Sequence, residues 1–209
     1  MALKRTSIVL CLIRGGETAW DGDGRVHGST DLPLSDAGLD AVTADAARLK
    51  GVRFSTVHHP PDEAGGQTAE LFARAAGAKA KPIDELADPD LGLLEGLLRQ
   101  DFAERYPKRY RQWQDDPLTL SPPEGEEIAE ARARIFAALA RVLRRSRSEE
   151  VAVVLHSLGL GLLRSWLADR PAGDLWTMLR GRDRVERYAL TGEMIEWLED
   201  ATRVEYSGS

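Results

Sequence analysis

The sequence contains a single cysteine and has no long hydrophobic run. Cys11 cannot form an internal disulfide, and its place in the apolar run of residues 8–13 is typical of a buried, inert thiol in a reducing compartment. No stretch approaches the roughly 20 apolar residues of a membrane-spanning helix, so no membrane partner is expected. The first residues carry two positive charges but are not followed by a segment long enough for a secretory signal, which predicts a cytoplasmic protein.

An excess of basic charge is also missing. The net charge is −6 at pH 7, and basic residues are scattered among acidic ones except for a short cluster between Arg141 and Arg147. That cluster lies at the end of a predicted helix, where it complements the helix dipole. Because nucleic-acid binding usually needs a basic stripe, we expect no nucleic-acid partner.

The length of 209 residues fits one α/β domain, which we predict to cover residues 1–209. Short apolar runs at residues 8–13 and 151–155, and a third candidate at residues 53–57, predict strands of a mainly parallel sheet. Residues 184–190 and 193–198 flank Thr191-Gly192, a pattern that predicts a hairpin. Helical patterns cover residues 35–50, 62–76 with Gly77 as the stop, 124–147 and 158–168.

Strands that alternate with helices predict a doubly wound, three-layer α/β/α fold. In such folds ligands bind beyond the carboxyl ends of the strands, so the segments after Ile13, Val57 and Leu155 are expected to meet in one cleft. The stretch of residues 89–123 is rich in Trp, Tyr, Arg and Pro and has little strand character. We predict that it forms a helical excursion, or lid, over this cleft.

Several segments resemble, in order, the motifs of one known enzyme family. Residues 12–20 read Leu-Ile-Arg-Gly-Gly-Glu-Thr-Ala-Trp and resemble the signature Arg-His-Gly-Glu-Thr-x-Trp-Asn of the histidine phosphatase superfamily. Segments 25–28, 31–38, 67–70, 91–96 and 153–156 look like its later motifs, so the resemblance spans about residues 8–167. It implies a phosphoglycerate-mutase-like fold.

The resemblance also implies a phosphohistidine mechanism. In that mechanism a histidine attacks phosphorus, two arginines and a second histidine hold the phosphoryl oxygens, and a carboxylic acid protonates the leaving oxygen. Arg14 matches the first arginine, but the position of the nucleophile is Gly15, which has no side chain to take its place. Asp21 stands where the signature has asparagine, and the second arginine falls on Glu63 or Ala64.

The remaining positions of the pattern keep part of a binding site. The second histidine corresponds to His156 and the proton donor to Asp88, so these two are the expected catalytic remnants. The residues that we expect to contact a ligand are Arg14, Glu17, Asp21, His27, His58 and His59. Loss of the nucleophile and of a cation predicts an impaired or inactive pseudo-phosphatase, without a cofactor, whose cleft binds an acidic or phosphate-containing small molecule or a protein partner. As a further partner we consider a second copy of this chain, in a homodimer.

Three alternatives follow from the same residues. A displaced histidine, either His27 or whichever of His58 and His59 faces the cleft, could make the protein an active phosphomonoester hydrolase. Histidines together with Asp88 could bind a metal, but they show no recognised ligand spacing, and we expect none. Residues 155–159 resemble the nucleophile elbow of α/β-hydrolases around Ser157, but no histidine follows it in the chain, so we set this reading aside.

Overall fold

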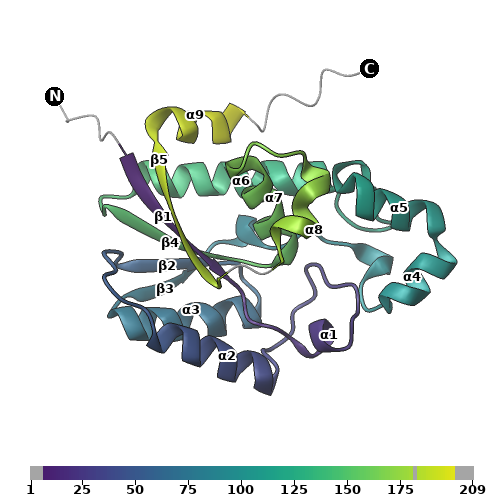
Figure 1. Ribbon diagram of the computed structural model, residues 1–209, viewed down its shortest axis with the longest axis horizontal. Helices are drawn as coiled ribbons and strands as arrows, with labels where there is room; N and C mark the ends of the chain where they lie inside the picture. The colour runs from purple at the N-terminus through teal and green to yellow at the C-terminus, as the bar shows by residue number, and fades with distance from the viewer. Residues whose placement is uncertain (1–6, 181–182, 201–209) are drawn as a thin grey trace.

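The computed structural model describes residues 7–180 and 183–200, and a five-stranded sheet lies at its centre (Figure 1). The strand order is β3-β2-β4-β1-β5. Strands β1 to β4 pair in parallel, whereas β5 runs antiparallel to β1 at one edge. The strands are β1 (Ser7–Arg14), β2 (Thr56–His59), β3 (Lys79–Pro82), β4 (Glu150–Leu155) and β5 (Val185–Thr191).

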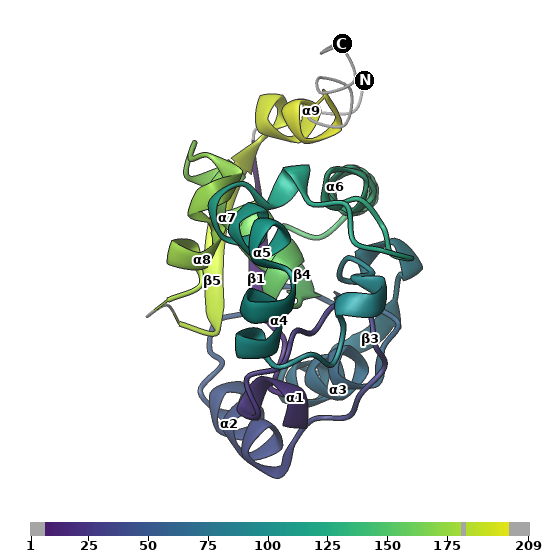
Figure 2. The same cartoon turned by 90° about the vertical axis from the view of Figure 1, so that its right-hand side faces the viewer.

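Helices cover both faces of the sheet, as the two perpendicular views show (Figures 1 and 2). Helices α2 and α3 close one core against β1, β2 and β4, and α6, α7 and α9 close the other. This arrangement confirms the predicted three-layer α/β/α fold with a mainly parallel sheet. The helices are α1 (Ala19–Gly22), α2 (Asp36–Ala47), α3 (Glu63–Ala76), α4 (Arg99–Arg105), α5 (Pro107–Asp115), α6 (Ile128–Arg145), α7 (Ser157–Leu167), α8 (Leu175–Met178) and α9 (Gly192–Asp200).

The central strands are apolar because both of their faces are covered. Every residue of β4 is buried, and in β1 the side chain of Cys11 is fully buried, as expected. Burial, together with the nearby carboxylate of Glu150, raises the pKa of the Cys11 thiol to about 12. The thiol is therefore protonated and inert at neutral pH.

Helices α4 and α5 form within the segment predicted as a helical excursion, and they lie at the end of the molecule where β1 and β4 finish (Figure 1). Their apolar side chains pack together, with the ring of Phe102 at 5.3 Å from that of Tyr110 and 6.3 Å from that of Trp113. The indole of Trp176 in α8 lies 4.7 Å from that of Trp113, and its Nε1 donates to the Trp113 carbonyl. The described part of the chain also contains four short 3-10 turns: Asp84–Leu86, Gly92–Leu94, Pro117–Thr119 and Ala172–Asp174.

The hairpin predicted around Thr191-Gly192 is wrong. The strand before this turn is present as β5, but it pairs with β1, and the residues after the turn form helix α9. Ile195 and Leu198 are the buried residues of α9, and their spacing of three is helical. The Thr-Gly pair therefore marks the change from strand β5 to helix α9 and not a turn between two strands.

Two strands differ from what the sequence predicts. The strand expected at residues 53–57 begins at Thr56 and runs to His59, so both adjacent histidines belong to β2. Strand β3 was not predicted, since its sequence Lys-Ala-Lys-Pro is polar, as suits an exposed edge. Within residues 7–180 and 183–200, no helix combines the length and the apolar character required to cross a bilayer.

Candidate functional site

A small cleft of about 40 Å³ lies beyond the carboxyl ends of β1 and β4, where the doubly wound fold predicts a ligand site. Helices α4 and α5 contribute to it through Arg99 and Trp113. The lining residues are Arg14, Gly15, Gly16, Glu17, Asp21, Arg25, Val26, His27, Asp88, Arg99, Trp113, His156, Ser157, Leu158 and Trp176.

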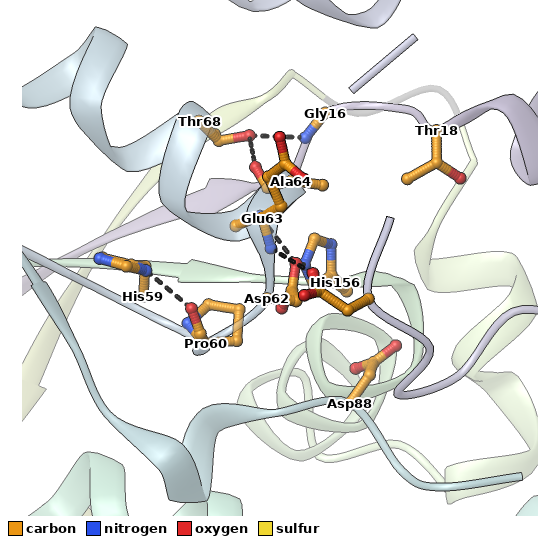
Figure 3. Close-up of polar contacts among 12 residues, drawn as sticks. Gly16, Thr18, His59, Pro60, Asp62, Glu63, Ala64, Thr68, Asp88 and His156 are labelled. Carbon is orange, nitrogen blue, oxygen red and sulfur yellow. Dashed lines mark hydrogen bonds and ion pairs between the residues drawn. The ribbon is translucent and has the colours of Figure 1, made fainter. Parts of the chain in front are cut away.

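The loop that follows β1 is held by backbone hydrogen bonds. The amide of Gly15 donates to the carbonyl of Leu155 at 2.9 Å, and the amide of Gly16 donates to Thr68 Oγ1 at 3.0 Å (Figure 3). Arg184 clamps the loop from the other side, because its Nη1 donates to the Gly15 carbonyl at 3.0 Å and its Nε binds Asp45 Oδ2 at 2.7 Å. These contacts from three parts of the chain fix the backbone of the loop around Gly15 and Gly16.

The ring of His156 fills the space where a side chain at position 15 would begin. A Cβ placed on Gly15 would lie 2.5 Å from His156 Nδ1 and 2.8 Å from its Cε1. Real Cβ atoms do not approach other atoms so closely, so a side chain on Gly15 and this placement of His156 exclude each other. The position of the His156 ring therefore depends on glycine at position 15.

Asp62 holds His156 in this position. Nε2 of His156 donates to Asp62 Oδ1 at 2.8 Å, and the same carboxylate oxygen accepts from the amide of Gly65 as the N-cap of α3 (Figure 3). Burial alone would lower the pKa of His156, but the hydrogen bond and the charge of Asp62, with the charge of Asp88, outweigh burial and raise it. For the carboxyl group of Asp62 the signs are reversed. Burial would raise its pKa, but the hydrogen bond and the charge of His156 outweigh burial and lower it.

Asp88, expected as the proton donor, is buried below the cleft and bonded to the start of α7. Its two carboxylate oxygens accept from the amides of Leu158 at 3.1 Å and Gly159 at 2.8 Å. Burial raises the pKa of Asp88, against the effect of His156 and of these amides. The carboxylate stabilises the N-terminus of α7, where the helix dipole favours a negative charge.

His27 and Asp21 form a second histidine–aspartate pair in the cleft. His27 Nδ1 lies 3.8 Å from Asp21 Oδ2 and 3.5 Å from Thr18 Oγ1, while its Nε2 donates to the carbonyl of Thr30 at 3.1 Å. Burial would lower the pKa of His27, but Asp21 and the Thr30 carbonyl outweigh it and raise this pKa. Burial would raise the pKa of Asp21, but hydrogen bonds from His27 and Thr18 lower it to about 2.

Three arginines line the cleft, and the sequence motifs predict a role for only one of them, Arg14. Within the described residues, the guanidinium groups of Arg14 and Arg99 make no hydrogen bond, whereas Arg25 donates to the carbonyl of Gly96 at 2.8 Å. Arg25 lies in a motif quoted for the family, so its position could have been singled out. Arg99 could not, because α4 reaches the cleft only through the tertiary fold.

The structure does not bring His58 and His59 into this cleft, contrary to the expectation for these residues. They alternate along β2, so His59 faces α3, where its Nδ1 donates to the carbonyl of Pro60 at 2.7 Å (Figure 3). His58 faces the opposite side of the sheet and lines a different groove. Neither side chain lines the cleft, and the three atoms nearest to a Cβ placed on Gly15 belong to His156.

The two positions that correspond to the second arginine of the motif pattern, Glu63 and Ala64, carry no positive charge. Glu63 is exposed and bonded to Gln67, and Ala64 is buried with no polar side-chain atom. Among the described residues, no group of three or more His, Cys, Asp and Glu side chains is arranged to hold a metal ion.

Comparisons with known proteins agree with the motifs. The family model for the histidine phosphatase superfamily (branch 1) matches residues 10–196. Phosphoserine phosphatase 1 from Hydrogenobacter thermophilus is 27% identical over 151 residues, which cover 72% of each chain. A Salmonella choleraesuis protein named "Probable phosphoglycerate mutase GpmB" is 28% identical over 200 residues, which cover 94% of this chain and 91% of the relative.

A solved structure shows the same arrangement of strands and helices. The alpha-ribazole phosphatase from Shigella flexneri superposes with a TM-score of 0.74 at 25% identity, over 88% of this chain and 94% of that one. The fold, the order of the motifs and a family match over nearly the whole chain lead to one conclusion: this protein belongs to branch 1 of the histidine phosphatase superfamily.

Proposed function

We propose that this protein is a pseudo-phosphatase, which binds a phosphate-bearing acidic small molecule in the strand-end cleft without transferring its phosphoryl group. The observation that carries the proposal is the missing side chain at position 15, together with the His156 ring that lies against it. A phosphohistidine intermediate needs an imidazole at that point, and no change of pKa or solvation can supply one from glycine.

The engagement of the other imidazoles supports the same proposal. A nucleophile needs a lone pair about 3 to 3.5 Å from phosphorus and in line with the bond that breaks. In the cleft, Nε2 of His156 is bonded to Asp62 and its Nδ1 faces Gly15. Both ring nitrogens of His27 face groups of its own loop. The alternative of a displaced nucleophile at His27, His58 or His59 therefore gains no support from these contacts.

Binding without turnover is supported by the arginines. Guanidinium groups grip phosphate oxygens in pairs, and those of Arg14 and Arg99 make no hydrogen bond to the described part of the protein. The carboxylates of Asp21 and Asp88 oppose an anion, so we expect weak binding. Since the cleft has room for about three water molecules, it would take the phosphate group and leave the rest of the ligand at its rim.

Titration with inorganic phosphate, followed by the NMR signals of the His27 and His156 rings, tests the binding half of the proposal. The parent protein should show saturable shifts, Arg14→Gln should lose them, and Arg74→Gln, which removes an exposed arginine on α3, should retain them. Equal behaviour of the two variants would contradict an anion site at Arg14.

Turnover of p-nitrophenyl phosphate tests the catalytic half. Removal of a nucleophile typically costs on the order of 10⁴ to 10⁶ in rate, so the parent should show no hydrolysis above the buffer rate. Hydrolysis by the parent that disappears in His27→Gln or His156→Gln, with a phosphohistidine trapped on that residue, would overturn the proposal.

The Gly15→His variant then asks whether the cleft has only lost its nucleophile or has also been rebuilt. A side chain at position 15 must displace His156, which Asp62 holds in place. We therefore expect no restored turnover in Gly15→His alone. Any recovery should need Asp62→Ser as well, because serine still caps α3 but releases the imidazole.

A further inference from the structure

A second and larger cavity lies away from the cleft, between the C-terminal part of α6 and the strands β2 and β3. Its volume is about 570 Å³, within the range of small-molecule sites. Residues of β2 and β3 line it, together with residues of the connection from α6 to β4. We call this cavity the α6 groove; it shares no lining residue with the cleft around Gly15.

Three basic side chains of the α6 groove have no ion-pair partner within the described residues. They are Lys81 from β3 and Arg145 and Arg147 from the end of α6 and the loop that follows it. All three are exposed, so they can move onto a ligand with little loss of existing contacts. In a protein with a net charge of −6, such a group is a local exception.

The acidic side chains of the groove are mostly neutralised already. Glu85 pairs with Arg141, Nη2 to Oε1 at 2.6 Å. Glu150 accepts from Arg187 Nε and from the amide of Arg53, each at 2.7 Å. Asp84 is the one lining carboxylate without such a partner among the described residues, so the groove keeps an excess of positive charge.

His58 adds a polar group at the floor of the groove, where it stands opposite Lys81 in the β2–β3 register. Burial, with the charge of Lys81, lowers the pKa of His58 to about 4, so the ring is neutral at pH 7. Its Nδ1 is buried without a hydrogen-bond partner among the described residues. A neutral imidazole carries one N–H group, so the ring can donate one hydrogen bond. The hydroxyl groups of Ser55 and Thr56 line the same cavity.

We propose that the α6 groove is a second ligand site, which binds a phosphate-bearing small molecule through Lys81, Arg145 and Arg147. Two guanidinium groups and an ammonium around one cavity suit the several oxygens of a phosphate or diphosphate, to which arginine donates in pairs. The neutral ring of His58 adds a donor without adding charge. The basic residues surround one cavity and do not extend as a stripe, which favours a small molecule over nucleic acid.

The test uses pyrophosphate as the probe, titrated at constant ionic strength and followed by the NMR signal of the His58 ring. The parent should bind saturably, with the His58 signal shifting together with the bound fraction. The double variant Arg145→Gln/Arg147→Gln should bind at least about tenfold more weakly, because both guanidinium forks are lost. The matched control Arg74→Gln/Arg105→Gln removes two exposed arginines elsewhere and should bind within about twofold of the parent, since general screening changes equally.

Arg14→Gln separates this site from the cleft and should leave the His58 shift unchanged. The proposal is overturned if the parent shows no saturable His58 shift, if both double variants weaken binding equally, or if Arg14→Gln alone abolishes it. Succinate at the same ionic strength should not produce the shift, and equal binding of succinate would overturn the assignment to phosphate. Adenosine 5′-diphosphate in place of pyrophosphate then shows whether the cavity also accepts an attached nucleoside.

Discussion

The cleft holds two histidine–aspartate pairs that differ in how they are built. Asp21 in α1 and His27 just after this helix lie close together in the chain, and their side chains are 3.8 Å apart. Asp21 also accepts from the amide and hydroxyl of Thr18 at 2.8 Å each. His156 and Asp62 lie 94 positions apart in the chain and make a direct hydrogen bond of 2.8 Å. The first pair joins residues that are close in the chain, whereas the second pair joins the end of β4 to the start of α3.

This difference separates a contact that depends on the space at Gly15 from one that does not. The His156–Asp62 contact needs the space at Gly15, because a Cβ there would collide with the imidazole. The His27–Asp21 pair needs no such space and would remain if position 15 carried a side chain. The long-range pair is therefore coupled to the absence of a side chain at position 15, and the local pair is not.

The largest expected effect comes from breaking the long-range pair with Asp62→Ala. This change removes the N-cap of α3 and leaves the buried His156 without its partner, so we expect a loss of about 3 kcal/mol in the free energy of unfolding. The control is Ser35→Ala, which removes the N-cap of α2 and no ion pair, at about 1 kcal/mol. Urea denaturation near pH 6 measures both, and equal losses would mean that the imidazole contributes nothing.

Gly15→Ala tests the steric coupling directly. The added methyl group collides with the ring of His156, so we expect a loss of about 1 to 3 kcal/mol. In a His156→Ala background the same change should cost little, and the difference is the coupling free energy of the double-mutant cycle. Gly22→Ala is the control, since a Cβ there meets open space. Additive effects of the two substitutions would contradict the mutual exclusion of the two side chains.

The sequence predicted the layers of the fold because buried strands and amphipathic helices leave clear periodic patterns. Continuous apolar runs marked β1 and β4, whereas the polar edge strand β3 carried no such pattern. The order of the motifs predicted that Arg14 and His156 both lie in the cleft, and both line it. The partner of His156 was not predicted, because Asp62 looks like an ordinary helix cap and its distance from His156 is set by tertiary packing alone.

The pH dependence of stability should sharpen the comparison further. The raised pKa of His156 means that its stabilising contribution is complete below the usual value of 6.5 and is lost as the pH rises through the raised pKa. The lowered pKa of Asp62 means that its contribution is present above 3.8 and is lost as the pH falls through the lowered value.

The Asp62→Asn variant should therefore differ most from the parent between about pH 4 and 6.5, and less at pH 8.5. Urea denaturation measures the difference in the free energy of unfolding between the parent and the variant. We expect a difference of about 1 to 2 kcal/mol at pH 5.5 and a smaller one at pH 8.5. In an NMR titration of the variant, the pKa of His156 should fall below its usual value, because burial then dominates. A stability difference that is independent of pH would show that the imidazole is not charged by this contact.

The smallest effect should come from Asp21→Asn. An asparagine oxygen still accepts from the amide and hydroxyl of Thr18, so only the negative charge near His27 is lost, at about 0.5 to 1 kcal/mol. The pKa of His27 should fall less than that of His156 does in Asp62→Asn, because the Thr30 carbonyl still accepts from its Nε2. Asp23→Asn, an exposed neighbour, is the control and should change neither quantity. If Asp21→Asn costs as much as Asp62→Asn at pH 5.5, the two pairs are energetically equivalent and the long-range contact has no special part in the altered cleft.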